Sequence, residues 1–323
     1  MHGLAERGIG ARVWDTSALE EAEVLRGVVA QGPGLVHAFH AWRTGPLAID
    51  LAGRLRVPYL VTLTGTDVNH DLGAADRGET VRRVLAGAAA VVVFHRSIAA
   101  LLTAALPEIA ARVVEIPQAV WLERHDRAVQ PAEWGLSPDQ ALVLFPGGIR
   151  VVKNPLVVLR GLDPVAARQP RVRLAYAGPI LEPAEGEALL AALRSRPWAR
   201  YLGEVPHTQM AALLSAADVV VNSSVSEGGM ANSVLEALAL GRAVLASDIE
   251  GNRSLIEHER TGLLFRDQDD LTVQAERLVT DPALRARLGA AGRALVERDY
   301  SPRREIDAYV ALYRSLGVLL PAR

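Results

Sequence analysis

Residues 219–241 read Val-Val-Val-Asn-Ser-Ser-Val-Ser-Glu-Gly-Gly-Met-Ala-Asn-Ser-Val-Leu-Glu-Ala-Leu-Ala-Leu-Gly. The β-branched run that ends at Asn222 predicts a buried strand, and the apolar spacing after Asn232-Ser233 predicts a helix. Between them, Gly228-Gly229 lets the backbone approach a ligand closely. Free amides at a helix start attract phosphate. The stretch therefore predicts a strand, an anion-binding loop and a helix in succession.

The same alternation of apolar runs and Ala/Leu/Arg-rich helical stretches continues through the rest of the chain. Most of the runs are too uniformly apolar for a sheet with one wet face, which is typical of parallel strands buried between helices. The sequence therefore predicts an α/β protein with doubly wound, Rossmann-like sheets. The expected strands are Ala11–Trp14, Leu35–Phe39, Tyr59–Leu63, Ala89–Phe94, Val113–Ile116, Ala141–Phe145, Val172–Ala177, Ala199–Leu202, Val219–Asn222 and Ala243–Ser247.

A length of 323 residues predicts about two domains. Residues 122–138 begin with a charged run without strand periodicity and then carry Pro131, Gly135 and Pro138, which predicts a linker. We expect an amino-terminal domain over 1–121 and a carboxyl-terminal domain over 139–302. The last helix, 303–323, should pack back on the first domain, with Ser301 and Pro302 at its start.

The chain opens on an expected helix, His2 to Arg7, with Gly8 as its cap. A doubly wound domain ordinarily opens on a strand and a Gly-rich turn, so the amino-terminal domain lacks its first strand. Either the natural reading frame starts upstream of Met1, or neighbouring strands close the gap. Direct pairing of Ala11–Trp14 with Leu35–Phe39 would indicate closure.

Composition excludes several classes of protein. The 35 basic and 37 acidic residues give a net charge of −2, which argues against a nucleic-acid partner. The absence of cysteine excludes a disulfide scaffold, a thiolate metal site and a cysteine nucleophile, and it is consistent with a cytoplasmic protein. No apolar run approaches the roughly 18 residues of a membrane span, and no signal peptide is visible. The residues leave the oligomeric state open, a homodimer included.

Two acids flank the predicted anion loop. Glu227 precedes it and Glu236 lies one turn into the following helix. Carboxylates do not bind phosphate, but they suit the hydroxyls of a sugar and of a ribose, as acids do in dinucleotide folds. The alternative is an ordinary strand–loop–helix turn with solvated acids, because a Gly-Gly pair before a helix is a weak motif.

Seven stretches of the sequence carry a resemblance to a known family: His-Ala-Phe-His-Ala-Trp-Arg (37–43), Leu-Thr-Gly-Thr-Asp-Val-Asn (63–69), Gly-Gly-Ile-Arg-Val-Val-Lys-Asn-Pro (147–155), Leu-Gly-Glu-Val-Pro (202–206), Asn-Ser-Ser-Val-Ser-Glu-Gly (222–228), Gly-Asn (251–252) and Glu-Arg-Thr-Gly-Leu-Leu-Phe (259–265). In these stretches the chain resembles the family 4 glycosyltransferases of the GT-B fold. The resemblance implies two Rossmann-like domains facing a cleft, with a nucleotide sugar bound mainly to the second. It also implies transfer with retention of configuration and without a metal or other cofactor.

The resemblance assigns roles to four residues. Glu227 matches the acid that contacts the donor sugar, and Glu236 matches the acid that holds the ribose. Lys153 matches the basic residue that neutralises the donor diphosphate. Negative charge develops on the β-phosphate as it leaves, so a fixed cation there lowers the barrier. Arg150, three residues earlier, is expected to stabilise the leaving diphosphate together with Lys153, whereas the family's usual arginine position is Gly148. Eight residues separate the two acids instead of the family's seven.

Further residues are expected to line the substrates. The amides of the loop and helix start would hold the diphosphate, and the ends of two strands would border the nucleobase. Together these are Gly228, Gly229, Met230, Ala231, Asn232, Ser233, Gly178, Pro179, Glu204 and Val205.

On the acceptor side we expect His40, Trp42, Arg43, Thr64 and Asp67, with Thr64 at the position where the family often has a histidine. The nearby His37 and His40 are either catalytic or satisfied structural groups. Asp67–Asp71 superficially resembles a metal loop but predicts a turn with a helix N-cap, so no metal site is expected.

The resulting prediction is a retaining hexosyl- or N-acetylhexosaminyltransferase that uses a nucleotide-diphosphate sugar, with UDP as the favoured nucleotide, on an unknown acceptor. One alternative is a transferase similar to selenosugar synthases, which share the 37–43 and 63–67 motifs. Another is a nucleotide-sugar-binding protein without activity, should the first strand and its loop be truly absent.

Overall fold

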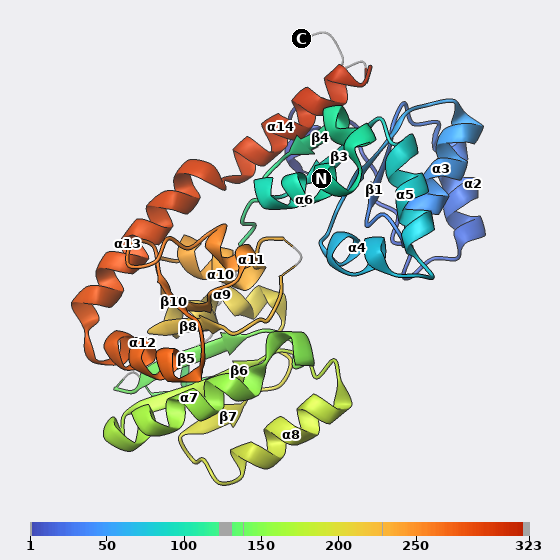
Figure 1. Ribbon diagram of the computed structural model, residues 1–323. Coiled ribbons are helices and arrows are strands. Elements are labelled where there is room, and N and C mark those ends of the chain that lie inside the picture. Colours follow the sequence, from blue (N-terminus) through green and yellow to red (C-terminus); the bar gives the residue numbers. More distant parts are fainter. Residues whose placement is uncertain (1, 123–130, 138, 228, 319–323) are drawn as a thin grey trace. The chain divides into compact units, whose positions relative to one another are not determined.

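The computed structural model describes residues 2–122, 131–137, 139–227 and 229–318 (Figure 1). They form two units, of which unit 1 comprises Met1–Ala119 with Tyr300–Arg323 and unit 2 comprises Val120–Asp299. The carboxyl-terminal helix therefore belongs to unit 1. No helix in the described part of the chain has the length and apolar character to cross a membrane.

Unit 1 contains a parallel sheet of four strands in the order β1-β2-β3-β4. The strands are β1 (Val36–Phe39), β2 (Tyr59–Thr62), β3 (Ala90–Val93) and β4 (Val113–Glu115). The α-helices are α1 (His2–Ala5), α2 (Glu21–Gln31), α3 (Gly45–Leu55), α4 (Thr66–Asn69), α5 (Gly78–Gly87), α6 (Arg96–Ala105) and α14 (Pro302–Ser315), and the 3-10 helices are η1 (Asp71–Gly73) and η2 (Pro107–Arg112). The α3, α5 and α6 helices follow strands, as a doubly wound sheet requires.

Unit 2 contains a parallel sheet of six strands in the order β10-β9-β8-β5-β6-β7. The strands are β5 (Ala141–Pro146), β6 (Val172–Ala177), β7 (Ala199–Tyr201), β8 (Val219–Asn222), β9 (Ala243–Ser247) and β10 (Leu263–Phe265). The helices are α7 (Pro155–Arg168), α8 (Pro183–Leu193), α9 (His207–Ala216), α10 (Asn232–Ala239), α11 (Glu250–Arg253), α12 (Gln268–Thr280) and α13 (Pro282–Asp299), with 3-10 turns at η3 (Pro131–Trp134) and η4 (Val151–Lys153).

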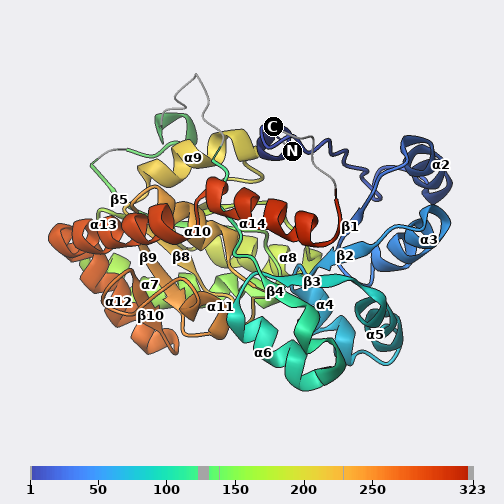
Figure 2. The ribbon, with the colours of Figure 1, turned by 90° about the horizontal axis from the view of Figure 1, so that it is seen from above.

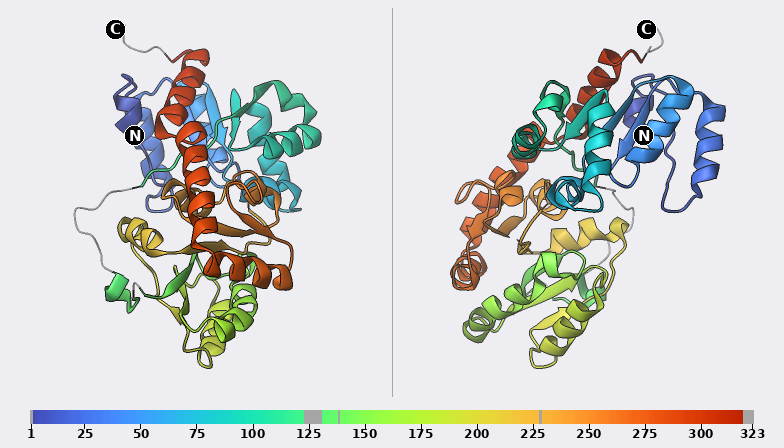
Figure 3. Two further views of the ribbon diagram at one scale, coloured as in Figure 1. Left: turned by 90° about the vertical axis from the view of Figure 1, so that its left-hand side faces the viewer. Right: turned by 45° about the vertical axis from the view of Figure 1, so that its right-hand side comes forward.

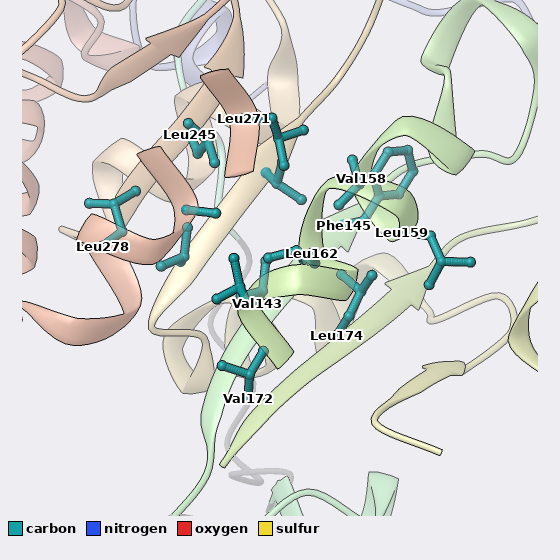
Figure 4. Packing of buried hydrophobic residues seen from close by; sticks show 14 of the residues in the cluster. Val143, Phe145, Val158, Leu159, Leu162, Val172, Leu174, Leu245, Leu271 and Leu278 are labelled. Atoms are coloured by element: carbon teal, nitrogen blue, oxygen red, sulfur yellow. The ribbon is translucent and has the colours of Figure 1, made fainter. Parts of the chain in front are cut away.

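The α/β prediction is confirmed, and every predicted strand but one appears with small shifts at its ends. The core of unit 2 explains the uniformly apolar strands, because they are covered by helices. Figure 4 shows Val158, Leu159 and Leu162 of α7 packed against residues of β5 and β6, and Leu271 and Leu278 of α12 complete the cluster. The strand order reverses between β5 and β8, and the carboxyl ends of these neighbouring strands are where a ligand site is expected in this class of sheet.

The predicted strand Ala11–Trp14 is wrong. Those residues form no strand, and β1 pairs with β2 alone among the described strands. The alternative in which Ala11–Trp14 pairs with Leu35–Phe39 is therefore not observed. The physical reason is that the Trp14 side chain packs against helix α2. Its ring occupies the space where Gly27 lacks a side chain, and it packs with Val24 and Val28 of α2. Figure 2 shows α2 beside α3, which shares this cluster.

Helix α14 is anchored in unit 1 by two tyrosines. It begins at Pro302 after Ser301, as predicted, although the Ser301 side chain makes no capping hydrogen bond. Tyr309 and Tyr313 are buried in a cluster with Leu60 and Val92 of the sheet. Helix α1 packs beside α14 (Figure 3), where Gly3 leaves room for the side chain of Ile306.

Candidate active site

The loops that follow β5 and β8 meet at one edge of the unit 2 sheet. The two strands are parallel neighbours, so their carboxyl ends lie together. The amide of Val225 donates to the carbonyl of Val152 at 2.9 Å, and the Ser223 hydroxyl lies 2.8 Å from the carbonyl of Lys153 and 3.0 Å from that of Asn154. Asn154 adopts a left-handed conformation with φ of 46°. This turn fixes the backbone of Lys153 before Pro155 starts α7.

Lys153 and Glu227 are separated by 74 positions along the chain, and they form an ion pair. Lys153 Nζ donates to Glu227 Oε1 at 2.5 Å, and the side chains are only 17 and 12 % exposed. The same oxygen accepts hydrogen bonds from Ser224 Oγ at 2.6 Å and from Asn222 Nδ2 at 3.1 Å. Three residues, Lys153, Asn222 and Ser224, thus converge on one oxygen of the Glu227 carboxylate.

The electrostatics of Glu227 follow from these contacts. Burial alone would raise the pKa of this carboxyl, but the Lys153 ammonium and the donors on Ser224 and Asn222 outweigh burial and hold the pKa below its usual range. Glu227 is therefore an ionised, oriented acceptor. Such a group suits a hydroxyl-bearing ligand, because hydroxyls donate to carboxylates.

Arg150 opens the turn that leads to Lys153. Its Nε is buried and has no hydrogen-bond partner among the described residues. The backbone that follows is held, since the amide of Val151 donates to Glu182 at 3.0 Å. A buried guanidinium N–H without a partner costs free energy unless an anion or water satisfies it. The structure thus leaves a cationic donor on the loop that also carries Lys153.

The start of α10 is at Asn232, as the sequence predicted. Its N-cap is Ala231, which has no side chain able to cap the first amides. Met230 and Ala231 are buried, Ser233 is half-buried, and Asn232 is exposed. The chain bends at Gly229, and Gly228 lies outside the described residues.

Glu236 is half-buried on the second turn of α10. Burial raises the pKa of its carboxyl, and the nearby His207 offsets only part of that effect. The described residues supply no hydrogen bond to the carboxylate. Glu227 and Glu236 are thus opposite in character, since one carboxylate has several partners and the other is desolvated without them.

The loops after β6 and β7 continue the same edge of the sheet. Gly178 has φ of 150°, and a Cβ at this position would lie 2.4 Å from the carbonyl oxygen of Gly147. Its amide donates to the carbonyl of Gly203 at 2.8 Å. These contacts bring Pro179, exposed Glu204 and buried Val205 to the edge that also carries the β5 loop.

On unit 1, Asp67 organises the loops rather than capping a helix in the expected way. The N-caps of α4 and η1 are Gly65 and His70, and neither makes a side-chain capping hydrogen bond, so the capping turn predicted for Asp67–Asp71 is not formed by a side chain. The completely buried Asp67 carboxylate accepts hydrogen bonds from the amides of Ala41, Thr64 and Gly65 at 2.8–3.2 Å. It therefore ties the loop after β1 to the loop after β2.

His40 has satisfied ring nitrogens and a strained backbone. Its φ is 80°, it is 7 % exposed, and its Nε2 lies 3.0 Å from the Thr66 hydroxyl. Burial lowers its pKa against the opposing pull of Asp67 and Asp71.

Three other acceptor-side predictions fall on accessible or partly accessible positions. Arg43 and Thr64 are exposed, while Trp42 is half-buried and stacks under the Arg77 guanidinium at 4.4 Å.

His37 is a structural group. Its Nδ1 lies 2.8 Å from the Tyr313 hydroxyl and its Nε2 lies 2.8 Å from the Thr62 hydroxyl, while its ring stacks on Phe39 with centroids 4.3 Å apart. A neutral imidazole has one donor and one acceptor nitrogen, and each hydroxyl takes either role. Burial lowers the pKa of His37 to about 3. His37 thus joins β1 to α14.

The contacts of Asn222 and Ser224 with Glu227 were not predicted from the sequence. Both lie in the polar run directly after the buried β8 strand, and that position at a strand's carboxyl end was the available signal.

The geometry agrees with the comparisons with known proteins. Residues 140–281 match the family described as "Glycosyl transferases group 1", and residues 3–119 match "Glycosyl transferase 4-like domain". Glycosyltransferase 1 domain-containing protein 1 of Xenopus tropicalis is 30% identical over 271 residues, which cover 81% of this chain and 78% of that protein. The chain belongs to the group 1 glycosyltransferases.

Other relatives and solved structures agree with this membership. The glycosyltransferase is 29% identical to a D-inositol 3-phosphate glycosyltransferase of Nocardioides, over 89% of this chain and 70% of that protein. The structure of Anabaena Alr3699/HepE in complex with UDP-glucose has a TM-score of 0.78 at 16% identity and covers 97% of this chain and 87% of its own. Sucrose-phosphate synthase from Thermosynechococcus elongatus has a TM-score of 0.75 at 23% identity, covering 91% and 77% of the two chains. The fold of this glycosyltransferase is GT-B.

Proposed function

We propose that this glycosyltransferase transfers a hexosyl or N-acetylhexosaminyl group from a UDP-sugar to an acceptor, with retention of configuration and without a metal ion. The observation that carries the proposal is the convergence of Lys153, Asn222 and Ser224 on Glu227. The Anabaena structures in complex with UDP and with UDP-glucose support the choice of nucleotide.

The diphosphate would bind between the β5 loop and the start of α10. An ammonium has three N–H donors, so Lys153 keeps two for phosphate while one holds Glu227. Arg150 adds a guanidinium, and the uncapped amides at Asn232 and Ser233 add neutral donors. These groups favour the departing diphosphate because they are fixed before negative charge accumulates on it.

The two acids would bind the two sugars of the donor. Glu227 would accept hydrogen bonds from hydroxyls of the transferred sugar. Glu236 would accept them from the ribose, whose hydroxyls would supply the donors that its desolvated carboxylate lacks.

The bond from the anomeric carbon to the β-phosphate oxygen breaks, and a bond from that carbon to the acceptor oxygen forms on the same face. The acceptor's proton passes to the departing phosphate oxygen. No side chain is assigned as a nucleophile.

A donor panel tests the proposal. The chain is incubated with UDP-, GDP- and ADP-glucose and with UDP-N-acetylglucosamine in EDTA, and binding is measured by calorimetry. Transfer to a panel of hydroxylated and phosphorylated acceptors is followed by mass spectrometry, with the anomeric configuration read by NMR. We expect preferential binding of a UDP-sugar and a product with the donor's configuration. An inverted product would contradict retention. Tight binding without transfer across the panel would favour a binding protein instead.

A further inference from the structure

Helix α11 packs directly on the residue that carries the central carboxylate. A Cβ built on Gly251 would lie 2.5 Å from the Cβ of Glu227 and 2.8 Å from the carbonyl oxygen of Gly229. Separations below about 3.0 Å do not occur between real atoms of this kind, so no larger residue fits without moving the loop. The backbone of Gly251 therefore limits where the Glu227 main chain can lie.

The next residue, Asn252, has no exposed surface, and its side-chain amide donates to Ser247 and Asn222. Its Nδ2 lies 3.0 Å from both the carbonyl and the hydroxyl of Ser247, and 3.4 Å from Asn222 Oδ1. All three atoms accept, so only the amino end of the amide can face them. The orientation of the Asn252 side chain is thereby determined.

The orientation of Asn222 is fixed in turn. Its Oδ1 accepts from the amide of Ser224 at 3.0 Å and from Asn252, which leaves its Nδ2 to donate to Glu227. A reversed amide would place oxygen against the Glu227 carboxylate.

Ser247 closes the network from β9. Its hydroxyl donates to the carbonyl of Ser224 at 2.6 Å, and accepts from Asn252. The contacts thus run from Asn252 of α11 to Asn222 and, through Ser247, to Ser224, which are two of the three donors to Glu227.

The buried Asn252 side-chain amide lowers the stability of the fold. Its Oδ1 is buried without a hydrogen-bond partner among the described residues. A buried, unsatisfied carbonyl oxygen destabilises a fold, whereas an apolar side chain of the same shape would not. The contribution of Asn252 therefore lies in its amino group, which is directed at the network behind Glu227.

We propose that Gly251 and Asn252 are positioning residues for Glu227, with Ser247 as their link, and that they set the orientation in which this carboxylate meets the donor sugar. The role toward the sugar rests on the function proposed above. The role toward the carboxylate does not.

The decisive experiment measures Glu227 without any donor. Side-chain carboxyl carbons of ¹³C-glutamate-labelled protein are titrated by NMR, and Glu227→Gln assigns the signal. Asn252→Leu keeps the shape but removes the donor, so Asn222 is released and its hydrogen bond to Glu227 weakens. We expect the acid dissociation constant of Glu227 to fall roughly tenfold, because donors to a carboxylate favour its charged form.

Donor binding gives the second measurement. Calorimetry compares UDP with the UDP-sugar that the wild-type chain binds most tightly. Asn252→Leu should leave UDP affinity within about twofold and weaken the UDP-sugar roughly tenfold, the factor typical of one hydrogen bond to a charged group. Arg253→Ala is the matched control on the same helix, since its side chain is 52% exposed and pairs with Asp248. It should change neither quantity.

If Asn252→Leu does not fold, the NMR titration and the calorimetry are carried out on Ser247→Ala and Gly251→Ala instead. An unchanged dissociation constant of Glu227 in a folded variant overturns the inference. Equal loss of UDP and UDP-sugar affinity also overturns it, because that pattern reports a general effect on the fold. Failure of the wild-type chain to bind any UDP-sugar overturns the proposed function and the sugar role, while the NMR result still decides the carboxylate role.

Discussion

Lys153 and Glu227 belong to different loops, yet the ammonium of one lies 2.5 Å from the carboxylate of the other, and each side chain is more than four-fifths shielded from water. A pair in such surroundings is coupled strongly, because removing one partner leaves the other with a desolvation cost and no compensation. The loop after β5 and the loop after β8 are thus linked by charge as well as by backbone hydrogen bonds.

A double-mutant cycle measures this coupling. We expect Lys153→Met and Glu227→Gln each to lower the free energy of unfolding, and the double variant to lose less than the sum of the two. The expected interaction energy is about 1–3 kcal/mol, the range for residues in one ion-pair network. Urea unfolding at neutral pH supplies the values. The exposed pair Arg293–Glu297 is the control, for which about 0.5 kcal/mol or less is expected. Strict additivity of Lys153→Met and Glu227→Gln would show that the contact contributes nothing.

The two acids should differ in what they contribute to binding. Glu236→Ala is expected to weaken free UDP more than Glu227→Ala does, because the first is assigned to the ribose and the second to the transferred sugar. The reason is that UDP retains the ribose and lacks the sugar. Isothermal calorimetry with UDP measures both, and loss of a charged hydrogen bond predicts a roughly tenfold weakening for Glu236→Ala. Identical UDP affinities in wild type and Glu236→Ala would contradict the ribose assignment.

The buried Glu236 carboxylate should also destabilise the ligand-free protein at neutral pH. Its pKa is raised on folding, so between its unfolded and folded values the native state binds more protons than the unfolded state. Its contribution is therefore favourable in acid and is lost as pH rises through that window. We expect Glu236→Gln to have a higher Tm than wild type at pH 7 and no advantage at pH 4. Differential scanning calorimetry without nucleotide tests the sign, and a lower Tm for Glu236→Gln at pH 7 would refute it.

The strand and the helix that flank the candidate site in unit 2 were predictable because their signals are local. The run of valines before Asn222 can only be satisfied in a buried strand, and the polar loop and helix start that follow lie where the sequence places them. The convergence on Glu227 was not predictable in this way. It depends on the pairing of β5 with β8 in the sheet, although Val219 of β8 follows Pro146 of β5 by 73 residues. It also depends on side-chain orientations fixed by Ser247 and Asn252.

The errors also have physical causes. Ala11–Trp14 is apolar at three of its four positions, but four residues are a weak signal, and Trp14 instead fills the space beside Gly27. Leu263–Phe265 forms β10, which is too short to be distinguished from a loop by periodicity. His37 was grouped with His40 because both flank Phe39, yet its partners Tyr313 and Thr62 come from distant segments.

His37 should make the docking of α14 sensitive to acid. Its pKa is about 3 in the folded protein and about 6.5 in an unfolded chain, so the unfolded state binds more protons between these values. Stability at this contact is therefore complete above about pH 6.5 and is lost progressively as pH falls toward 3. Hydrogen exchange of the α14 amides, followed by mass spectrometry, should accelerate between pH 7 and pH 4.5 after correction for intrinsic exchange. His37→Gln cannot be protonated, so its α14 should exchange faster than wild type at pH 7 but change less on acidification. His70→Gln, at an exposed position of the same unit, is the control and should follow wild type. If His37→Gln shows the same acid response as wild type, then protonation of another group, and not of this imidazole, releases α14.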